Sequence, residues 1–246
     1  DPVRDVEILD LELQVRDLDL VERKIARLEK ASKSGDKKIL KGIDVLKKFV
    51  NHFENFQNAR DLALSEDEKI WTEDMFLLTA KPVLYVCNVD DESAVEGNGY
   101  VRSVQDALKG SGAQIMIIAG KLEAEITELD DEDDRAEFLN DAGLTEPGVN
   151  KLIRGAYDLL HLQSFFTAGP KEVKAWTIRK GMTAPQAAGV IHSDLERGFI
   201  RAEVMKYPDF IKLGSESACK DAGRFFVEGK NYVVDDGDIM HIRFNV

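Results

Sequence analysis

The chain has 246 residues, of which 43% are hydrophobic and 32% charged, and its formal net charge is −13. This composition is typical of a globular protein and excludes an intrinsically disordered one. The negative charge argues against nucleic-acid binding over the whole surface, although a local basic face remains compatible with it. The longest apolar stretches, PVLYVC and IMIIAG, are far too short to span a membrane, so no membrane contact is expected.

The two cysteines, Cys87 and Cys219, lie far apart, and neither a CxxC pair nor a cluster of histidines accompanies them. The sequence therefore predicts neither a zinc site nor a disulfide framework, and it favours a reducing, cytoplasmic setting. No signal-peptide pattern opens the chain. Because the chain starts at Asp1 rather than Met, we expect further sequence to precede it.

Residues 1–80 are predicted to form a helical hairpin, because apolar residues recur at spacings of three and four. The first stripe consists of Leu11, Val15, Leu18, Val21, Ile25 and Leu28, and the second of Ile39, Ile43, Leu46, Val50 and Phe53. The stretch SKSGDKK between them is a turn, so we expect two antiparallel helices with a coiled-coil-like seam. Such a hairpin either stabilises the fold or protrudes as an arm that contacts a partner, and the pattern alone favours the first.

Residues 81–127 alternate strand, helix and strand. PVLYVC and AQIMIIAG are apolar on both faces, as expected for parallel strands that are covered by helices on both sides. A helix over 100–109 is predicted between them. Two such β-α units do not close a stable doubly wound sheet, so we expect this zone to be the end of a larger one.

An acidic connector follows, with nine Asp and Glu residues from Glu123 to Glu137 and Arg135 as the only base. Runs of this kind are typical of solvated helix faces or linkers. Gly143, Pro147 and Gly148 then interrupt the chain before a further helix, which is predicted over 149–160.

Residues 161–246 contain segments rich in β-branched and aromatic residues, which predict strands. These segments are EVKAWTI, GFIRAEVM, KNYVV and DIMHIRFNV. In FIRAEVMK, Ile200, Ala202 and Val204 are expected on the buried face of the strand. Met205 is expected on the opposite face, because successive side chains of a strand alternate.

An Ala-rich helix is predicted between the first two of these strands, with Thr183 as its N-cap. The order is then β-β-α-β, followed by a helical stretch and two final strands. This order predicts a small β-grasp, in which one helix packs across a mixed sheet. The whole chain is therefore expected to be α/β with additional α and α+β parts.

Two strings in this region carry a likeness to a known family: FFTAGPKEVKAWTIRKGMTAPQAAGVIHSDLERGFIRAEVMKY and the ending DGDIMHIRFNV. They resemble the C-terminal TGS domain of the Obg-like ATPase (YchF) family. TGS domains also occur in threonyl-tRNA synthetases and SpoT-type proteins. The opening DPVRDVEILDLELQVRDLDLVERK is similar to the segment that leads into this family's helical hairpin, so the resemblance covers essentially the whole chain.

The resemblance implies three parts. They are a helical hairpin (coiled-coil) domain at 1–80, the end of a P-loop nucleotide-binding G domain with the acidic connector at 81–160, and a TGS β-grasp domain at 161–246. It also implies an enzyme that hydrolyses ATP, and GTP less well, with Mg²⁺. By the same resemblance the enzyme associates with the large ribosomal subunit and regulates translation or the stress response.

The catalytic machinery of such an enzyme is expected upstream of this sequence. No GxxxxGK[ST] loop occurs in residues 1–246, and that loop and its lysine bind the phosphates while its Ser or Thr holds Mg²⁺. We therefore predict no catalytic residue and no metal ligand here, and we expect these residues alone to be inactive.

Base recognition is the part of this chemistry that the resemblance assigns to the present residues. GTPases recognise guanine with an NKxD motif at a strand end, and the family has NxxE instead. Here the motif reads Asn88-Val89-Asp90-Asp91, so Asn88, Val89 and Asp91 are expected to contact the purine. Asp91 stands where the family has Glu, and this shorter carboxylate is closer to the guanine-binding arrangement. Without the likeness, Asn and Asp at a strand exit are ordinary turn formers.

A second base-contacting loop is expected after the next strand, at Ala119, Gly120, Lys121 and Leu122. Backbone N–H groups make most of the contacts in such a loop, and Gly120 allows a close approach of the backbone to the ring. Taken alone, Gly120 is equally typical of a residue that ends a strand.

The rival hypothesis is a non-enzymatic module, in which the hairpin and the TGS domain dock on ribosomal RNA or protein. A local excess of basic residues in the TGS region supports contact with RNA phosphates. Basic residues scattered over a surface without a partner are, however, the commoner explanation of such an excess. The excess consists of Lys171, Lys174, Arg179, Lys180, Arg197 and Arg201. His192 is expected to pack or to cap a helix, and Trp71 and Trp176 are expected in the core.

Overall fold

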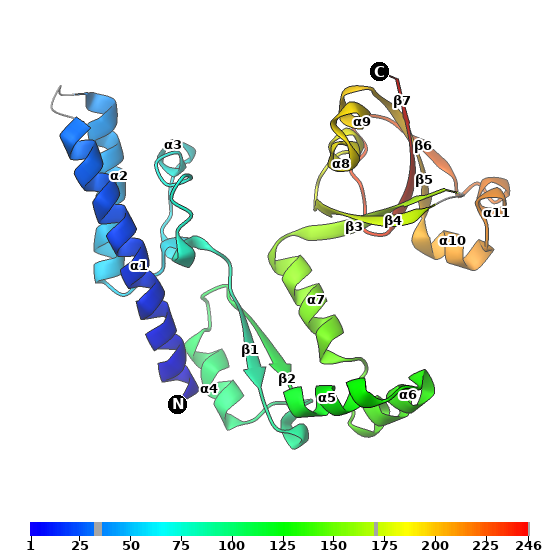
Figure 1. The fold of residues 1–246 in the computed structure, drawn as a ribbon, viewed down its shortest axis with the longest axis horizontal. Helices are drawn as coiled ribbons and strands as arrows, with labels where there is room; N and C mark the ends of the chain where they lie inside the picture. The colour runs from blue at the N-terminus through cyan, green and yellow to red at the C-terminus, as the bar shows by residue number, and fades with distance from the viewer. Residues whose placement is uncertain (32–35, 170–171, 246) are drawn as a thin grey trace. The chain divides into compact units, whose positions relative to one another are not determined.

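The computed structural model describes residues 1–31, 36–169 and 172–245. The chain divides into two compact units, Asp1–Leu152 and Ile153–Val246. Each unit has hydrophobic clusters of its own, and both are drawn in Figure 1. No helix among the described residues combines the length and the apolar character that a membrane span requires.

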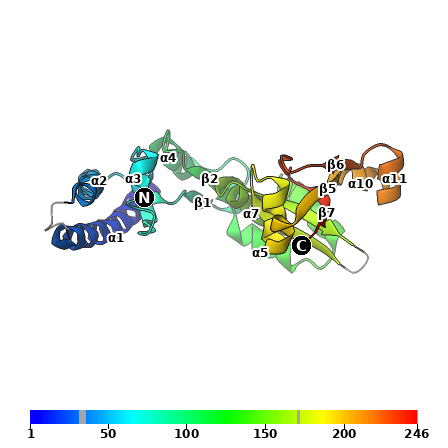
Figure 2. The ribbon, with the colours of Figure 1, turned by 90° about the horizontal axis from the view of Figure 1, so that it is seen from above.

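The first unit begins with two long helices that lie side by side, α1 at Pro2–Ala31 and α2 at Lys37–Glu54 (Figures 1 and 2). The predicted turn between them falls largely on 32–35, outside the described residues. Asp36 begins α2 by accepting a hydrogen bond from the Lys38 N–H at 2.8 Å. The predicted helical hairpin is therefore confirmed.

The buried stripe of α1 differs from the predicted one in the first half of the helix. Leu11 and Val15 are exposed, whereas Asp17 is fully buried. The Asp17 carboxylate accepts hydrogen bonds from the Leu78 N–H, the Thr79 N–H and the Thr79 hydroxyl at 2.6–2.8 Å. Polar contacts with a distant segment thus determine which face of α1 is buried in its first half. The spacing of apolar residues cannot predict such contacts.

The second half of α1 and most of α2 follow the predicted stripes, with Val21, Leu46 and Phe53 in one cluster. Val45 and Phe49 are buried in the same cluster although they lie outside the predicted stripe. The chain after α2 closes this cluster with Trp71 and Met75. Its short elements are η2 at Ala59–Asp61, α3 at Glu66–Lys69 and η3 at Leu78–Ala80. The hairpin is therefore covered along one side by a third segment, which a two-helix coiled coil would leave open.

Two parallel strands follow, β1 at Leu84–Asn88 and β2 at Gln114–Ile118, connected by the predicted helix α4 at Gly99–Ala107. Among the described residues, only one face of β1 is covered. Val86, in the middle of β1, is 46% exposed. Because side chains alternate along a strand, one face of β1 packs on α4 while the other lies open in the described part of the chain.

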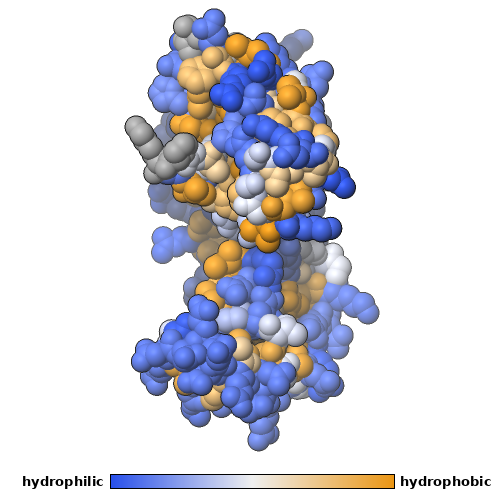
Figure 3. Space-filling view, turned by 90° about the vertical axis from the view of Figure 1, so that its right-hand side faces the viewer, coloured by the Kyte–Doolittle hydropathy of each residue, from blue (hydrophilic) through white to orange (hydrophobic). Residues whose placement is uncertain are grey.

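The acidic connector forms helices, and a further helix follows it as predicted. They are α5 at Gly120–Glu128, α6 at Glu132–Asp141 and α7 at Gly148–Leu159. Asp131 begins α6 by accepting a hydrogen bond from the Asp133 N–H at 2.7 Å. The surface over α5 and α6 is mostly hydrophilic (Figure 3), as expected for solvated helix faces.

The second unit is built on a mixed five-stranded sheet with the order β4-β3-β7-β5-β6. Its strands are β3 at Leu162–Ala168, β4 at Val173–Arg179, β5 at Phe199–Lys206, β6 at Phe226–Glu228 and β7 at Asp238–Phe244. β3 and β7 are parallel, and the other neighbours are antiparallel.

Helices cover both faces of this sheet (Figure 1). They are α8 at Ala184–Ile191, α9 at Ser193–Arg197, α10 at Tyr207–Leu213 and α11 at Glu216–Asp221. The pair α8 and α9 packs on a core around Phe165, whereas α10 and α11 pack on a second cluster around Met205. The helical stretch predicted after β5 forms the second pair, and it covers the sheet face that a one-helix arrangement leaves open.

Local signals in this unit are confirmed. Thr183 begins α8, and Gln186 completes a capping box with it. His192 is a capping residue, because its Nδ1 accepts a hydrogen bond from the Asp194 N–H at 3.2 Å at the start of α9. Trp176 packs partly buried against the main core.

The predicted strand KNYVV does not form, and β6 lies a few residues earlier in the chain. Val233 makes only an isolated bridge to Thr183. The neighbouring backbone groups bond to the loop before α8, since the Val234 N–H donates to the Met182 carbonyl at 3.0 Å. Val234 of this segment is therefore buried in the core of the second unit, and the segment does not pair as a strand of the sheet.

The alternation predicted for FIRAEVMK is wrong at its start, whereas Met205 lies on the face opposite Ala202 and Val204 as expected. Ile200 is 53% exposed and Met205 is buried, although Ala202 and Val204 are buried as expected. A register shift after Phe199 interrupts the ladder with β7, and an irregularity of this kind changes which face a side chain meets. Met205 is buried because α10 and α11 cover the second face of the sheet.

Candidate functional site

The candidate base-binding residues gather where β1 and β2 end. The strands are parallel with Asn88 opposite Ile118, so their carboxyl ends lie at one edge of the sheet, where α/β proteins bind ligands. The Asn88 Oδ1 accepts a hydrogen bond from the Gly120 N–H at 2.9 Å. The Val89 N–H donates to the Ile118 carbonyl at 2.8 Å. These two bonds tie the motif after β1 to the loop after β2.

The acidic residues of the motif stand on a short turn, η4, at Asp91–Ser93. Asp90 stabilises this turn, because its Oδ1 accepts a hydrogen bond from the Ser93 N–H at 3.0 Å. The Asp91 carboxylate lies 3.7 Å from the Lys121 Nζ. Lys121 lies equally close to Glu125, at 3.6 Å. Exposed ion pairs of this kind stabilise little, so a ligand can displace them at small cost.

The seven predicted site residues fall into two groups. Asn88, Asp91, Gly120 and Lys121 are exposed at the edge of the sheet. Val89, Ala119 and Leu122 pack in a hydrophobic cluster with Ala94 and with residues of α5 and α6. The packed group holds the two loops in place, and the exposed group is what a ligand can contact.

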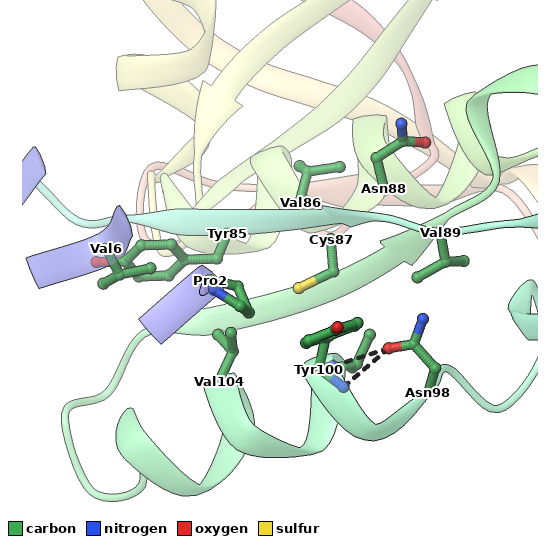
Figure 4. A pocket seen from close by; sticks show the side chains of 11 residues that line it. Pro2, Val6, Tyr85, Val86, Cys87, Asn88, Val89, Asn98, Tyr100 and Val104 are labelled. Atoms are coloured by element: carbon green, nitrogen blue, oxygen red, sulfur yellow. Dashed lines mark hydrogen bonds between the residues drawn. The ribbon is translucent and has the colours of Figure 1, made fainter. Parts of the chain in front are cut away.

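A cavity of about 260 Å³ lies on one side of β1, between the strand, α4 and the start of α1. Cys87 and Val89 point from the strand toward α4, whose Tyr100 and Val104 line the opposite wall (Figure 4). The side chain of Asn88 points to the other side of the strand. The lining of the cavity is mainly apolar, and Asn88 and Asn98 are its amide side chains.

Two titratable groups line this cavity. Burial raises the pKa of the Cys87 thiol, which stays protonated at neutral pH and is a poor nucleophile. Burial, and secondly the Asp10 carboxylate, raise the pKa of the Tyr85 hydroxyl. That hydroxyl is buried and has no hydrogen-bond partner among the described residues. Neither group is suited to acid–base chemistry near neutral pH.

Two residues that shape this region were missed in the sequence. Asn98 begins α4 by accepting a hydrogen bond from the Tyr100 N–H at 3.0 Å, and an Asn before a helical segment is a recognisable cap. Glu123 accepts a hydrogen bond from the Gly148 N–H at 2.6 Å and so joins α5 to the start of α7. Nothing local marks Glu123, because its partner lies 25 positions away and its neighbours are also acidic.

The described residues do not fit a metal site. They contain no group of three or more His, Cys, Asp or Glu side chains that could hold an ion. The carboxylates at the sheet edge are instead engaged with Lys121 or with backbone N–H groups. This edge therefore offers exposed hydrogen-bonding groups to a ligand.

Residues 162–245 match the family YchF-GTPase_C, described as "Protein of unknown function (DUF933)". The whole chain is 47% identical over 246 residues to the ribosome-binding ATPase YchF of Haemophilus ducreyi and covers 67% of that protein. It is 39% identical over 259 residues to Obg-like ATPase 1 of Rattus norvegicus, of which it covers 63%.

Among solved structures, that of the Schizosaccharomyces pombe YchF GTPase matches 99% of this chain with a TM-score of 0.84 and 32% sequence identity. This chain covers 66% of that one. The similarity runs through the helical hairpin, the parallel strands and the C-terminal mixed sheet, and it extends beyond fold to sequence. The chain therefore belongs to the YchF family of Obg-like ATPases, and it spans about two thirds of the length of its relatives.

Proposed function

We propose that this chain supplies the base-recognition edge of a P-loop nucleoside triphosphatase that hydrolyses ATP, and GTP less well, with Mg²⁺. The observation that most directly supports this proposal is the hydrogen bond between the Asn88 Oδ1 and the Gly120 N–H. It joins the two loops that are expected to hold the purine. The relatives support both nucleotides, since one is named an ATPase and another a GTPase.

The groups at this edge give the proposal its chemistry. With its Oδ1 bonded to Gly120, the Asn88 amide keeps its NH₂ donors for an acceptor such as the purine N7. The Asp91 carboxylate accepts hydrogen bonds only, so it suits the N–H donors of a base. Guanine presents two such donors side by side, whereas adenine presents one donor beside an acceptor. The reach of Asp91 therefore governs which purine is preferred.

The same proposal assigns the parts of the chain. Residues 1–80 are the helical hairpin domain, 81–160 are the end of the G domain with β1 and β2 as the last strands of a doubly wound sheet, and 161–246 are the TGS β-grasp domain. The groups that bind the phosphates and Mg²⁺ are assigned to the part of the relatives that this chain does not cover.

Calorimetric titration of ATP and GTP tests the base site, in a protein that includes any residues encoded before Asp1. We expect the double variant Asn88→Ala, Asp91→Ala to bind both nucleotides about thirtyfold more weakly, since it loses at least two hydrogen bonds worth about 1 kcal/mol each. Asp106→Ala is the matched control, because Asp106 is an exposed acid on α4. Nucleotide binding that the double variant leaves unchanged would refute the assignment.

A second function, docking on the ribosome, is favoured by the charge of the hairpin. Residues 23–48 contain ten Lys and Arg and three Asp and Glu, in a chain of net charge −13. Arg27, Lys30 and Lys41 are exposed and form no ion pair among the described residues. Such a basic segment attracts RNA phosphates. The relative from Haemophilus ducreyi is named ribosome-binding, and a ribosomal partner implies a cytoplasmic location.

The bases expected to meet RNA in the second unit are less available. Lys180 pairs with Asp158 at 2.7 Å, and Arg197 pairs with Asp194 at 2.8 Å. Lys174 lies over a tryptophan ring, 4.0 Å from its centroid. Lys171 falls outside the described residues. These engagements make the hairpin the stronger candidate for phosphate contacts.

Co-sedimentation with large ribosomal subunits over a range of salt concentrations tests the docking function. We expect Arg27→Gln, Lys30→Gln and Lys41→Gln together to weaken binding, and to reduce the salt slope by about 0.9 for each phosphate that is no longer neutralised. Lys69→Gln, Lys109→Gln and Lys212→Gln together are the control, because they remove the same charge outside the basic segment. An equal loss in the control would show that net charge, and not this segment, determines binding.

A further inference from the structure

One acidic residue of the connector differs from the others in its surroundings. The connector has nine Asp and Glu residues from Glu123 to Glu137, all within the described residues, and Glu123 is the one that is not exposed. Its Oε1 accepts a hydrogen bond from the Gly148 N–H at 2.6 Å. A solvated acidic helix face does not require such a partner, so the composition of the connector does not explain this contact.

Glu123 acts as an N-terminal cap for α7, a helix to which it does not belong. Gly148 is the first residue of α7, and the first N–H groups of a helix have no partner within it. The first turn of α7 contains no acidic residue of its own. A carboxylate at this end is stabilised both by the hydrogen bond and by the helix dipole. Glu123 therefore supplies from α5 the acid that α7 lacks.

The contact depends on the absence of a side chain at residue 148. A Cβ at Gly148 would stand 2.6 Å from the Glu123 Oε1 and 3.4 Å from the Ile118 Cγ1. Gly148 is buried, and it thus lies against both α5 and the end of β2. Only glycine allows the carboxylate to come this close to the backbone of α7.

Glu123 also adjoins the loop that is expected to hold the purine. It follows Ala119–Leu122 directly, and its N–H donates to the Ala119 carbonyl at 3.0 Å. At the other end of this loop, the Gly120 N–H donates to the Asn88 Oδ1 at 2.9 Å. The loop is therefore fixed to β1 at one end, and to α7 just beyond the other.

We infer that Glu123 is a positioning residue for purine binding, which fixes the Ala119–Leu122 loop by capping α7. This inference rests on the function proposed for the edge of the sheet. The Glu123 carboxylate is bonded to α7, so it is not among the groups that face a ligand. A loop that is already in place loses less conformational freedom when a ligand binds. Because Glu123 changes no group that faces the base, it affects ATP and GTP equally.

Hydrogen exchange measured by NMR on this chain tests the positioning. Glu123→Ala is expected to speed exchange at the Gly148 amide, which loses its acceptor, and severalfold at the Gly120 amide. Glu123→Gln retains an acceptor and should keep both rates. Glu128→Ala is the matched control, because it removes an exposed acid from the same helix. Faster exchange at Gly148 with an unchanged rate at Gly120 overturns the inference, since the contact then stabilises α7 alone.

Gly148→Ala breaks the same contact from the other side, because the new Cβ displaces the carboxylate. Exchange at the Gly120 amide should therefore also be faster in this variant. The double variant Glu123→Ala, Gly148→Ala should exchange no faster at Gly120 than the single variants, since both substitutions remove one contact. Effects that add in the double variant overturn the inference.

Calorimetric titration of ATP and GTP, in a protein that includes any residues encoded before Asp1, measures the consequence for binding. We expect Glu123→Ala to weaken both nucleotides about fivefold, because the loop must then be ordered on binding. The ratio of the two dissociation constants should stay the same, and Glu123→Gln should bind normally. A changed ratio overturns the inference, because the side chain then contacts the base.

The variant Asn88→Ala, Asp91→Ala separates a failure of this inference from a failure of the proposed function. If that variant binds nucleotide more weakly while Glu123→Ala binds normally, the inference is overturned. If neither variant changes binding, the function proposed for the edge is wrong. Faster exchange at Gly120 in Glu123→Ala then still supports the role of Glu123 in fixing the loop.

Discussion

The Asn88 amide oxygen and the Gly120 N–H meet at 2.9 Å across the ends of β1 and β2, although the two residues are 32 positions apart. A Cβ at residue 120 would stand 3.0 Å from that oxygen. A side chain at residue 120 would therefore crowd the Asn88 amide that accepts this bond. The bond sets the spacing of the two loops before any ligand is bound.

Asn88→Ala is expected to speed hydrogen exchange at the Gly120 amide, because the N–H then bonds only to water. We expect a loss of about 1 kcal/mol of local protection, measured by NMR exchange. The Val89 amide, which donates to the Ile118 carbonyl, should keep its rate. Asn88→Asp retains an acceptor and should preserve protection, and an unchanged Gly120 rate in the alanine variant would contradict the contact.

Asp17→Ala is expected to destabilise the first unit by about 3 kcal/mol or more, because it leaves the buried N–H groups of Leu78 and Thr79 without their acceptor. Urea denaturation followed by circular dichroism measures the loss. Asp19→Ala is the control, since Asp19 is exposed on the same helix and pairs only with Arg23 in the described structure. That control should change the free energy of unfolding by at most about 0.5 kcal/mol, and an equal loss in both variants would contradict the role of Asp17.

Gly42→Ala is expected to destabilise the hairpin, although alanine has the higher helix propensity. An added Cβ would lie 2.5 Å from ring atoms of Trp71, so the ring must move. Overpacking costs about 1–3 kcal/mol, against a gain of about 1 kcal/mol from propensity. Trp71 fluorescence and urea denaturation report the change.

Two further variants test that explanation. Trp71→Leu combined with Gly42→Ala should recover part of the stability, because the smaller side chain makes room for the new methyl group. Gly99→Ala, at the first position of α4, meets nothing within 4 Å and should be tolerated. The overpacking account would be wrong if Gly42→Ala proved as stable as Gly99→Ala.

The second unit is expected to lose stability at alkaline pH. Burial, and then the hydrogen bond to Asp238, raise the pKa of Tyr232 from 10.0 to about 12. Burial lowers the pKa of Lys206, but hydrogen bonds to Asp235, Asp238 and Tyr232 outweigh it and raise the pKa overall. A group whose pKa is raised on folding stabilises fully below its unfolded pKa and loses that effect as the pH passes its folded pKa.

The free energy of unfolding should therefore fall from about pH 10 to about pH 12, the window set by Tyr232. Urea denaturation at a series of pH values measures this fall. Tyr232→Phe removes the titrating hydroxyl and should flatten the profile in that window. A profile as steep in the variant as in the parent would show that other groups cause the loss.

Much of the architecture was predictable from the order of residues. Spacings of three and four predicted both helices of the hairpin, β-branched runs predicted β1, β2 and most strands of the mixed sheet, and Thr183 predicted the start of α8. These features depend on near neighbours, whose contacts repeat with the period of a helix or strand. The resemblance to the YchF family likewise came from continuous stretches of the sequence.

Most of the failures involve contacts between distant residues, whereas the missed cap at Asn98 is a local one. Asp17 is buried because a segment about 60 positions later supplies donors to it, and Met205 is buried because α10 and α11 fold over the second sheet face. For the candidate site, the Asn88–Asp91 motif predicted which residues follow the strands. Only the folded structure shows that Val89, Ala119 and Leu122 pack in a hydrophobic cluster, whereas the other predicted residues are exposed. A long-range hydrogen bond or a covering helix leaves no periodic trace in the sequence, so its effect becomes visible only when the chain is folded.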